Sequence, residues 1–119
     1  MKKYSTTHQW VEVQDGIATI GITKHAAEQL GEITFIEIPE INRIFQAGEC
    51  FGTVESIKTA SEIFAPVKGT VCERHEELET NPEIVNQDPE GNGWLCRFKD
   101  INAADLDSLM TEEEYLKSL

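Results

Sequence analysis

Short runs of alternating apolar and polar residues, separated by turn residues, make up the first part of the chain. The run WVEV at residues 10–13 alternates strictly, and IATIGI follows at residues 17–22. Between them lies Asp15-Gly16, a dipeptide typical of two-residue hairpin turns. This pattern predicts an antiparallel β-hairpin near the N-terminus.

The period of the pattern changes after this hairpin. Thr23 can cap a short helix over residues 24–30 (KHAAEQL), and Gly31 occupies the position of a left-handed helix C-cap. β-Branched and aromatic residues return over residues 32–41, where Pro39 ends a strand or places it at a sheet edge. The pattern therefore predicts one short internal helix between strands.

Two further apolar runs flank a lysine in the middle of the chain. Residues 50–57 and 62–74 read as strands, and Lys58-Thr59-Ala60-Ser61 between them predicts a four-residue hairpin loop. Pro66 and Gly69 indicate a further turn, in which we expect Gly69 to need a positive φ. Lys58 is thus expected at the tip of two strands, clear of the sheet.

The last third of the chain contains fewer strands. Residues 79–94 are rich in Asn, Pro, Gly and Asp and predict a loop with one helical turn at residues 82–86. A last strand is expected over residues 94–98. An amphipathic helix is expected over residues 103–109.

A second tail helix is signalled by Thr111 and Glu114, which form a Thr-x-x-Glu capping box. Short strands at close spacing with little helix predict a mainly β protein, a small antiparallel sandwich or barrel with helical additions.

Size and charge narrow the classes of function. A chain of 119 residues fits a single domain, 1–119, with one modest core. Ten basic and twenty-two acidic residues give a formal charge of −12. This charge disfavours nucleic acid and anionic membrane surfaces as partners, and it favours proteins with basic docking patches.

Other signals are absent from the sequence. No apolar run has the length of a membrane span, and the N-terminus lacks the apolar region of a secretory signal. Cys50, Cys72 and Cys96 are odd in number and contain no CxxC pair. They predict free thiols in a reducing cytosol and neither a zinc site nor a disulfide framework.

The chemically versatile side chains form no catalytic pattern. His8, His25 and His75 lack the spacing of metal ligands, and we expect His25 and His75 to be solvated surface residues. No phosphate-binding glycine loop is present. Lys58 in a tight turn is a poor catalyst, since a solvated amine stays protonated, but it is well presented to a modifying enzyme. On position alone, an ordinary surface lysine is the commoner interpretation.

The sequence around this lysine is similar to that of a known family. Residues 54–71 (VESIKTASEIFAPVKGTV) resemble the lipoyl-lysine hairpin of the glycine cleavage H-protein family. Residues 8–13, 16–41 and 81–99 resemble further segments of the same family in the same order. The resemblance therefore covers almost the whole chain.

The resemblance implies a fold and a function. The fold is a flattened two-sheet barrel-sandwich of the biotinyl/lipoyl-carrier type, with a short internal helix and C-terminal helices. Lys58 would carry lipoate in amide linkage, with a reach of about 14 Å. The arm would shuttle the aminomethyl group of glycine between glycine decarboxylase (P protein), aminomethyltransferase (T protein) and dihydrolipoyl dehydrogenase (L protein). The protein itself would be no enzyme.

The resemblance also assigns roles to single residues. Glu55 and Gly69 match positions that lipoylating enzymes, a lipoate ligase or an octanoyltransferase, read in the family. Glu62 matches an acidic position near the loaded arm, where a carboxylate can pair with the aminomethyl ammonium.

The family resemblance also places an N-terminal segment beside the arm. Thr7, His8, Gln9 and Trp10 match a stretch that lines the arm's cleft. The family commonly has Glu where this chain has Gln9, so one negative charge is missing there and Glu62 carries more of the role.

Three alternatives share the same hairpin. A biotin carrier usually has Met on both sides of the lysine, whereas Ile57 and Thr59 flank Lys58 here. Lipoyl domains of 2-oxoacid dehydrogenases typically have Asp directly before the lysine. A relay protein that passes octanoyl or lipoyl groups between carriers would use the same Lys58.

The location of the protein is also suggested by the sequence. Because the chain starts with Met1 and lacks a transit peptide, we expect the protein to be located in a bacterial cytoplasm.

Overall fold

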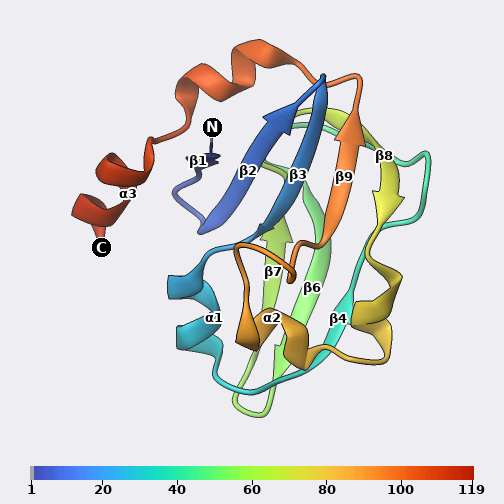
Figure 1. Ribbon diagram of the computed structural model, residues 1–119, viewed down its shortest axis with the longest axis vertical. Coiled ribbons are helices and arrows are strands. Elements are labelled where there is room, and N and C mark those ends of the chain that lie inside the picture. The colour runs from blue at the N-terminus through green and yellow to red at the C-terminus, as the bar shows by residue number, and fades with distance from the viewer. Residues whose placement is uncertain (1) are drawn as a thin grey trace.

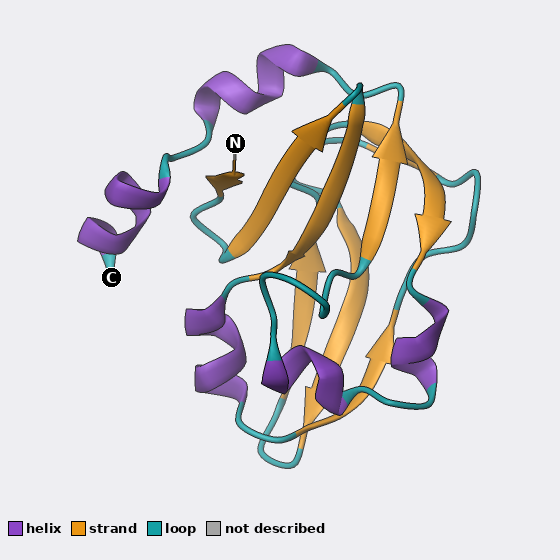
Figure 2. Ribbon diagram, in the orientation of Figure 1, coloured by secondary structure: helices purple, strands orange, loops and turns teal. Residues whose placement is uncertain are grey.

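The computed structural model describes residues 2–119 as two antiparallel sheets packed face to face, with helices around them (Figures 1 and 2). The six-stranded sheet has the order β1-β2-β3-β9-β8-β5, and the three-stranded sheet has the order β4-β6-β7. The strands are β1 Lys2–Tyr4, β2 Gln9–Gln14, β3 Ile17–Ile22, β4 Ile33–Glu37, β5 Ile44–Phe45, β6 Cys50–Ser56, β7 Ala60–Phe64, β8 Gly69–Arg74 and β9 Cys96–Lys99. The molecule measures 36 × 35 × 21 Å, so the flattened two-sheet architecture is confirmed.

Short helices lie at the edges of the two sheets. The α-helices are α1 Lys24–Leu30, α2 Glu83–Gln87 and α3 Glu112–Ser118, and the 3-10 helices are η1 Glu76–Glu79 and η2 Ala103–Ser108. Across residues 2–119, no helix is long and apolar enough to cross a membrane. The internal helix and the helical C-terminal tail are confirmed, although residues 103–108 form a 3-10 helix where an α-helix was expected.

Turns and helix caps whose hydrogen bonds are made within a few residues were predicted correctly from the sequence. Asp15 and Gly16 both have positive φ, 53° and 77°, and connect β2 to β3 in an antiparallel hairpin. Thr111 and Glu114 make both hydrogen bonds of the predicted capping box at the start of α3. These elements are confirmed.

The end of α1 differs from the prediction. Thr23 caps the helix by accepting a hydrogen bond from the backbone of Ala26, as expected. Gly31 has a φ of 76° but a ψ of −146°, which is outside the left-handed helical region. The chain leaves α1 in an extended direction toward β4, a conformation almost restricted to glycine. Glycine is therefore required at residue 31, but for an extended conformation with positive φ and not for a left-handed helix C-cap.

The lysine hairpin is tighter than expected, and the run after it is divided. The tip comprises residues 57–59, because the backbone N–H of Ser56 donates to the Thr59 carbonyl at 2.7 Å and β7 begins at Ala60. The predicted strand over residues 62–74 is two strands, β7 and β8, which belong to different sheets. The chain crosses between the sheets at residues 65–68.

Three phenylalanines join the two sheets at the centre of the core. Phe45 and Phe98 come from the six-stranded sheet and Phe51 comes from the three-stranded sheet. Their ring centroids lie 5.9–6.1 Å apart, and all three side chains are buried. Each buried ring contributes about 1.5–3 kcal/mol to stability. This cluster holds the sheet that carries the lysine hairpin against the other sheet.

Gly69 is needed for close packing, and the expectation of a positive φ at this residue is wrong. Among the described residues, the glycines with positive φ are Gly16, Gly31 and Gly48. A Cβ at Gly69 would lie 2.8 Å from Cβ of Phe98 and 3.1 Å from Cγ2 of Ile101. Gly69 also lies beyond the far end of β7, about 17 Å of strand from the hairpin tip.

We therefore expect Gly69→Ala to lower the free energy of unfolding by about 1–3 kcal/mol, because the added methyl group overpacks the core against Phe98. Urea denaturation followed by circular dichroism measures the change. Lys68→Ala, an exposed neighbour, serves as the control and should stay within about 0.5 kcal/mol of the wild type. Equal stability of the two variants would contradict the packing role.

Candidate functional site

Lys58 stands at the tip of the β6–β7 hairpin, at the bottom of Figure 1. Residues 57–59 are all exposed. The hydroxyl oxygen of Ser56 accepts hydrogen bonds from the backbone N–H groups of Lys58 and Thr59, both at 3.2 Å. A serine at this position replaces the missing strand partners of two backbone donors. The backbone of Lys58 is therefore held in place while its side chain is displayed.

The end of helix α1 lies against this lysine. A Cβ built on Gly31 would lie 3.1 Å from Cε and 3.5 Å from Nζ of Lys58. The backbone N–H of Ile57 donates to the carbonyl of Glu32 at 3.1 Å. One side of the tip is therefore covered by the segment that follows α1, and the absence of a side chain at Gly31 leaves room for the lysine.

A groove of about 350 Å³ runs beside the hairpin, between α1, the start of β2 and the strands β6 and β7. Apolar side chains such as Leu30 and Ile63 are part of its lining. The groove brings together residues that lie far apart in the sequence: Thr7, His8, Gln9, His25, Ser61 and Glu62. Thr7, His8, Gln9 and Glu62, which the resemblance assigns to the cleft, thus border one hollow on the flank of the lysine hairpin, whereas neither Trp10 nor Lys58 is among its lining residues.

Neighbouring residues of the edge strand β7 face opposite sides of the sheet. Ser61 pairs with the buried Val54 and shares its inward face, whereas Glu62 pairs with Thr53 on the solvent face. Glu62 therefore borders the groove from the sheet edge, and Ser61 faces it more directly. The alternation of β7 around Ile63 is the signal that could have identified Ser61 in the sequence.

Gln9 is buried at the rim of the groove, and its amide is used within the protein. Its Oε1 accepts hydrogen bonds from the hydroxyls of Ser5 and Thr7, and its Nε2 donates to the carbonyl of Thr7 at 2.9 Å. A carboxylate could accept the same two bonds but would lack the donor. The amide thus fixes the turn before β2 and leaves this part of the groove uncharged.

His8 belongs to a chain of polar contacts that reaches the C-terminal helix. Its Nδ1 lies 2.7 Å from the hydroxyl of Tyr115, which lies 2.8 Å from the hydroxyl of Thr23. The ring of His25 packs against that of His8 at a centroid distance of 4.9 Å and an interplanar angle of 41°. Burial, and secondly the neighbouring His25, lower the pKa of His8 below its ordinary value. The imidazole is therefore neutral at neutral pH.

The expectation that His25 and His75 are solvated is wrong. His25 is half-buried against His8. The side chain of His75 is 13% exposed, and its ring stacks on Trp94 with its Nδ1 2.6 Å from the Trp94 carbonyl. Sequence spacing contained no sign of these partners, which come from the turn before β2 and from the loop before β9.

The three cysteines carry free thiols, as predicted. Cys96 is buried in β9, and burial raises the pKa of its thiol as well as that of the half-buried Cys72. Such thiols react slowly. Within residues 2–119, no group of three or more His, Cys, Asp or Glu side chains is arranged to hold a metal ion.

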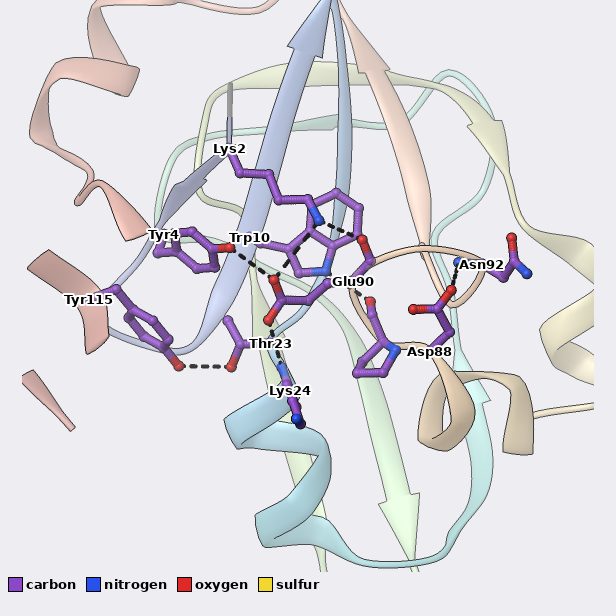
Figure 3. Close-up of polar contacts among 10 residues, drawn as sticks. Lys2, Tyr4, Trp10, Thr23, Lys24, Asp88, Glu90, Asn92 and Tyr115 are labelled. Atoms are coloured by element: carbon purple, nitrogen blue, oxygen red, sulfur yellow. Dashed lines mark hydrogen bonds and ion pairs between the residues drawn. The ribbon is translucent and has the colours of Figure 1, made fainter. Parts of the chain in front are cut away.

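A larger groove of about 770 Å³ lies on another side of α1, toward α2 and α3. Its wall contains Glu90, whose carboxylate accepts hydrogen bonds from the Tyr4 hydroxyl at 2.9 Å and from the backbone N–H of Lys24 at 3.0 Å (Figure 3). Burial and the Glu90 carboxylate together raise the pKa of Tyr4. Lys58 does not line this groove, although Gly31, which lies against Lys58, does.

Comparisons with known proteins identify one family. A family model described as "Glycine cleavage H-protein" matches residues 2–119. The glycine cleavage system H protein of Thermotoga maritima is 44% identical over 97% of this chain and 93% of its own length. That of Bacteroides fragilis is 50% identical over 95% of this chain and 90% of its own length. A crystal structure of a glycine cleavage system H protein from Mycobacterium marinum superposes with a TM-score of 0.89 at 32% identity, covering 98% of this chain and 94% of that one.

We expect His8→Asn to flatten the pH dependence of stability between about pH 8 and pH 5.5. Because the pKa of His8 is lowered on folding, the unfolded chain binds more protons as the pH falls through the ordinary histidine value of about 6.5. The wild type is therefore fully stabilised by this group above that value and loses the contribution below it. Asn tolerates the positive φ of 73° at this position.

Urea denaturation at several pH values measures the slope for each variant. Thr6→Asn changes an exposed residue of the same turn without removing a titrating group, so it should keep the wild-type slope. A wild-type slope in His8→Asn would show that His8 does not titrate differently on folding.

Proposed function

Because the chain belongs to the glycine cleavage H-protein family, we propose that Lys58 carries lipoate in amide linkage and that this arm shuttles the aminomethyl group of glycine. Proteins of this family are lipoyl carriers of the glycine cleavage system, and this chain is one of them. The observation that carries the assignment to Lys58 is its position at an exposed three-residue tip whose backbone Ser56 holds in place.

The residues around Lys58 fit such an arm. The amine is free to be acylated, and the groove beside the hairpin offers apolar walls with a few polar groups at its rim. When bound, lipoate would supply a disulfide: one sulfur would take up the aminomethyl group while the other is reduced to a thiol, and the dithiol left after transfer of the group would be reoxidised to the disulfide. The chain itself contributes position and environment, so we infer that it acts as a substrate and shuttle and not as a catalyst.

The groove presents a single charged side chain to a cationic group. Among the described residues that line it, Glu62 is the one carboxylate, while Gln9 is an amide and His8 is neutral because its pKa is lowered. A neutral imidazole does not repel an ammonium ion. Glu62 is exposed, so pairing with the ammonium of the loaded arm would contribute about 0–1 kcal/mol.

The partners follow from the cycle in which such carriers act. We propose that the loaded arm visits glycine decarboxylase (P protein), aminomethyltransferase (T protein) and dihydrolipoyl dehydrogenase (L protein), and that a lipoate ligase or octanoyltransferase acylates Lys58. The charge of −12 supports docking to basic surfaces on these enzymes. The bacterial relatives support a bacterial cytoplasm as the setting, and the family match over residues 2–119 supports a single carrier domain.

Incubation with a lipoate ligase, ATP and lipoate should add one lipoyl group to the wild type and none to Lys58→Arg. Arginine keeps the charge and most of the length but presents no amine that is acylated under these conditions. Intact mass and a peptide map measure the outcome. Lys68→Arg is the control and should be modified as fast as the wild type. Lipoate mapped to any other lysine would overturn the assignment.

The storage role of the groove is tested on the loaded protein. Glu62→Gln should lose the aminomethyl group faster in the absence of the transferase, by up to about fivefold, because an exposed ion pair contributes at most about 1 kcal/mol. Gln9→Glu should slow the loss by adding a negative charge, at some cost in stability because the donor to the Thr7 carbonyl is missing.

Release of ammonia and formaldehyde measures the rate of loss in each variant. Glu37→Gln removes a carboxylate from the same sheet without changing the groove lining, so it should match the wild type. Identical rates in all variants would mean that the arm is not held in this groove.

A further inference from the structure

One face of the three-stranded sheet points away from the core and is covered by no other element of the described chain. The cross-strand pairs place two rows of side chains on it: Phe35, Glu55 and Ala60 in one row, and Glu37, Thr53 and Glu62 in the other. Thr53 is half-buried and the other five are exposed. These six residues define what we call the outer face. In Figure 1 it points away from the viewer, since this sheet lies behind the six-stranded one.

The outer face combines one aromatic side chain with charged residues that are all acidic. Phe35 is 49% exposed, and its direct neighbour on β6 is Glu55. Strands β4, β6 and β7 contain no Lys or Arg at all. A complementary surface is therefore basic, with an apolar recess for one ring.

The outer face is continuous with the modification site. Glu55 and Ala60 are a cross-strand pair, and only residues 56–59 lie between them along the chain. Ile57, beside the lysine, is 68% exposed and extends the apolar surface to the tip. On another side of the tip, the segment after α1 lies against Lys58. The outer face is therefore the uncovered side of the hairpin from which an enzyme can approach the lysine.

The length of the side chain at Lys58 before and after modification indicates which enzyme must contact the outer face. The amine of an unmodified lysine extends only about 6 Å from its Cα, whereas a lipoyl arm extends about 14 Å. The enzyme that forms the amide must bring its active site to the hairpin itself, while enzymes that use the finished arm can remain further away. The acylating enzyme must therefore contact the strands that flank the tip, whereas the other enzymes can act through the arm.

We propose that the outer face, with Phe35 as its apolar anchor and Glu37, Glu55 and Glu62 as its charged rim, docks the enzyme that lipoylates Lys58. The proposal rests on the proposed function, since it takes Lys58 as the acylated residue. The anchor supplies affinity by burying a ring that is half exposed in the free protein, and the carboxylates orient and accelerate the encounter.

The test compares Phe35→Thr with Ile44→Thr in lipoylation of the unmodified protein by a lipoate ligase. Both changes replace an exposed apolar side chain of a strand with threonine, a β-branched residue that strands accept well. Ile44 differs in its location, since it is 60% exposed in β5 of the other sheet. Phe35→Thr should raise KM about tenfold with little change in kcat, and Ile44→Thr should leave both unchanged. Equal KM values for the two variants would overturn the docking role.

A second measurement is the affinity of the ligase for a variant that it cannot acylate. The ligase should bind Lys58→Arg, which is not acylated, and adding Phe35→Thr to that variant should weaken binding by a similar factor in titration calorimetry. The triple variant Glu37→Gln, Glu55→Gln, Glu62→Gln should show a KM that depends less on NaCl than that of the wild type. An unchanged salt dependence would remove the charged rim from the proposal.

Two further outcomes separate this proposal from the assignment of Lys58. If the wild type gains no lipoyl group at Lys58, the proposed function fails. If it does, and Phe35→Thr behaves like the wild type, only the docking role fails. After full lipoylation, dihydrolipoyl dehydrogenase should reoxidise Phe35→Thr and the wild type at equal rates. A tenfold loss there as well would overturn the assignment of this face to the acylating enzyme.

Discussion

The carboxylate of Glu90 joins parts of the chain that lie far apart in the sequence, and the position of the lysine site depends on it. Glu90 accepts hydrogen bonds from Tyr4 in β1 and from the first backbone N–H of α1 at Lys24, with Lys2 nearby (Figure 3). The start of α1 is thereby fixed to the N-terminal strand and to the loop before β9. Since α1 borders both grooves and Gly31 at its end lies against Lys58, Glu90 fixes one end of the wall beside the lysine, and Asn86 fixes the other through hydrogen bonds with Gly31 and Ile33.

Features that depend on neighbouring residues were predictable from the sequence, and features that depend on distant packing were not. The turn at Asp15-Gly16 and the cap at Thr111 need only local hydrogen bonds. The packing of Gly69 against Phe98 requires knowledge of which strands meet. The groove residues were reached by family resemblance, but the neutral state of His8 was not, because it follows from burial and from the packing of His25 against His8, which only the fold reveals.

Strand β7 gives the hairpin two surfaces of different character. Because side chains alternate along a strand, Ser61 faces the groove while Glu62 lies on the outer face and reaches the groove only from the sheet edge. Consecutive residues of this edge strand therefore serve a hollow on one side and a docking surface on the other. The short length of the tip keeps both surfaces within reach of a single lysine.

The rigid tip has a consequence for how strongly a tethered group must bind. An arm of about 14 Å on a fixed pivot sweeps roughly a hemisphere, so its end is present beside the protein at an effective concentration of about 0.3 M. A contact with an intrinsic dissociation constant of only about 0.1 M would then be occupied most of the time. Weak binding in the groove is thus sufficient for protection in transit, and the same weakness allows an enzyme to withdraw the cargo at little energetic cost.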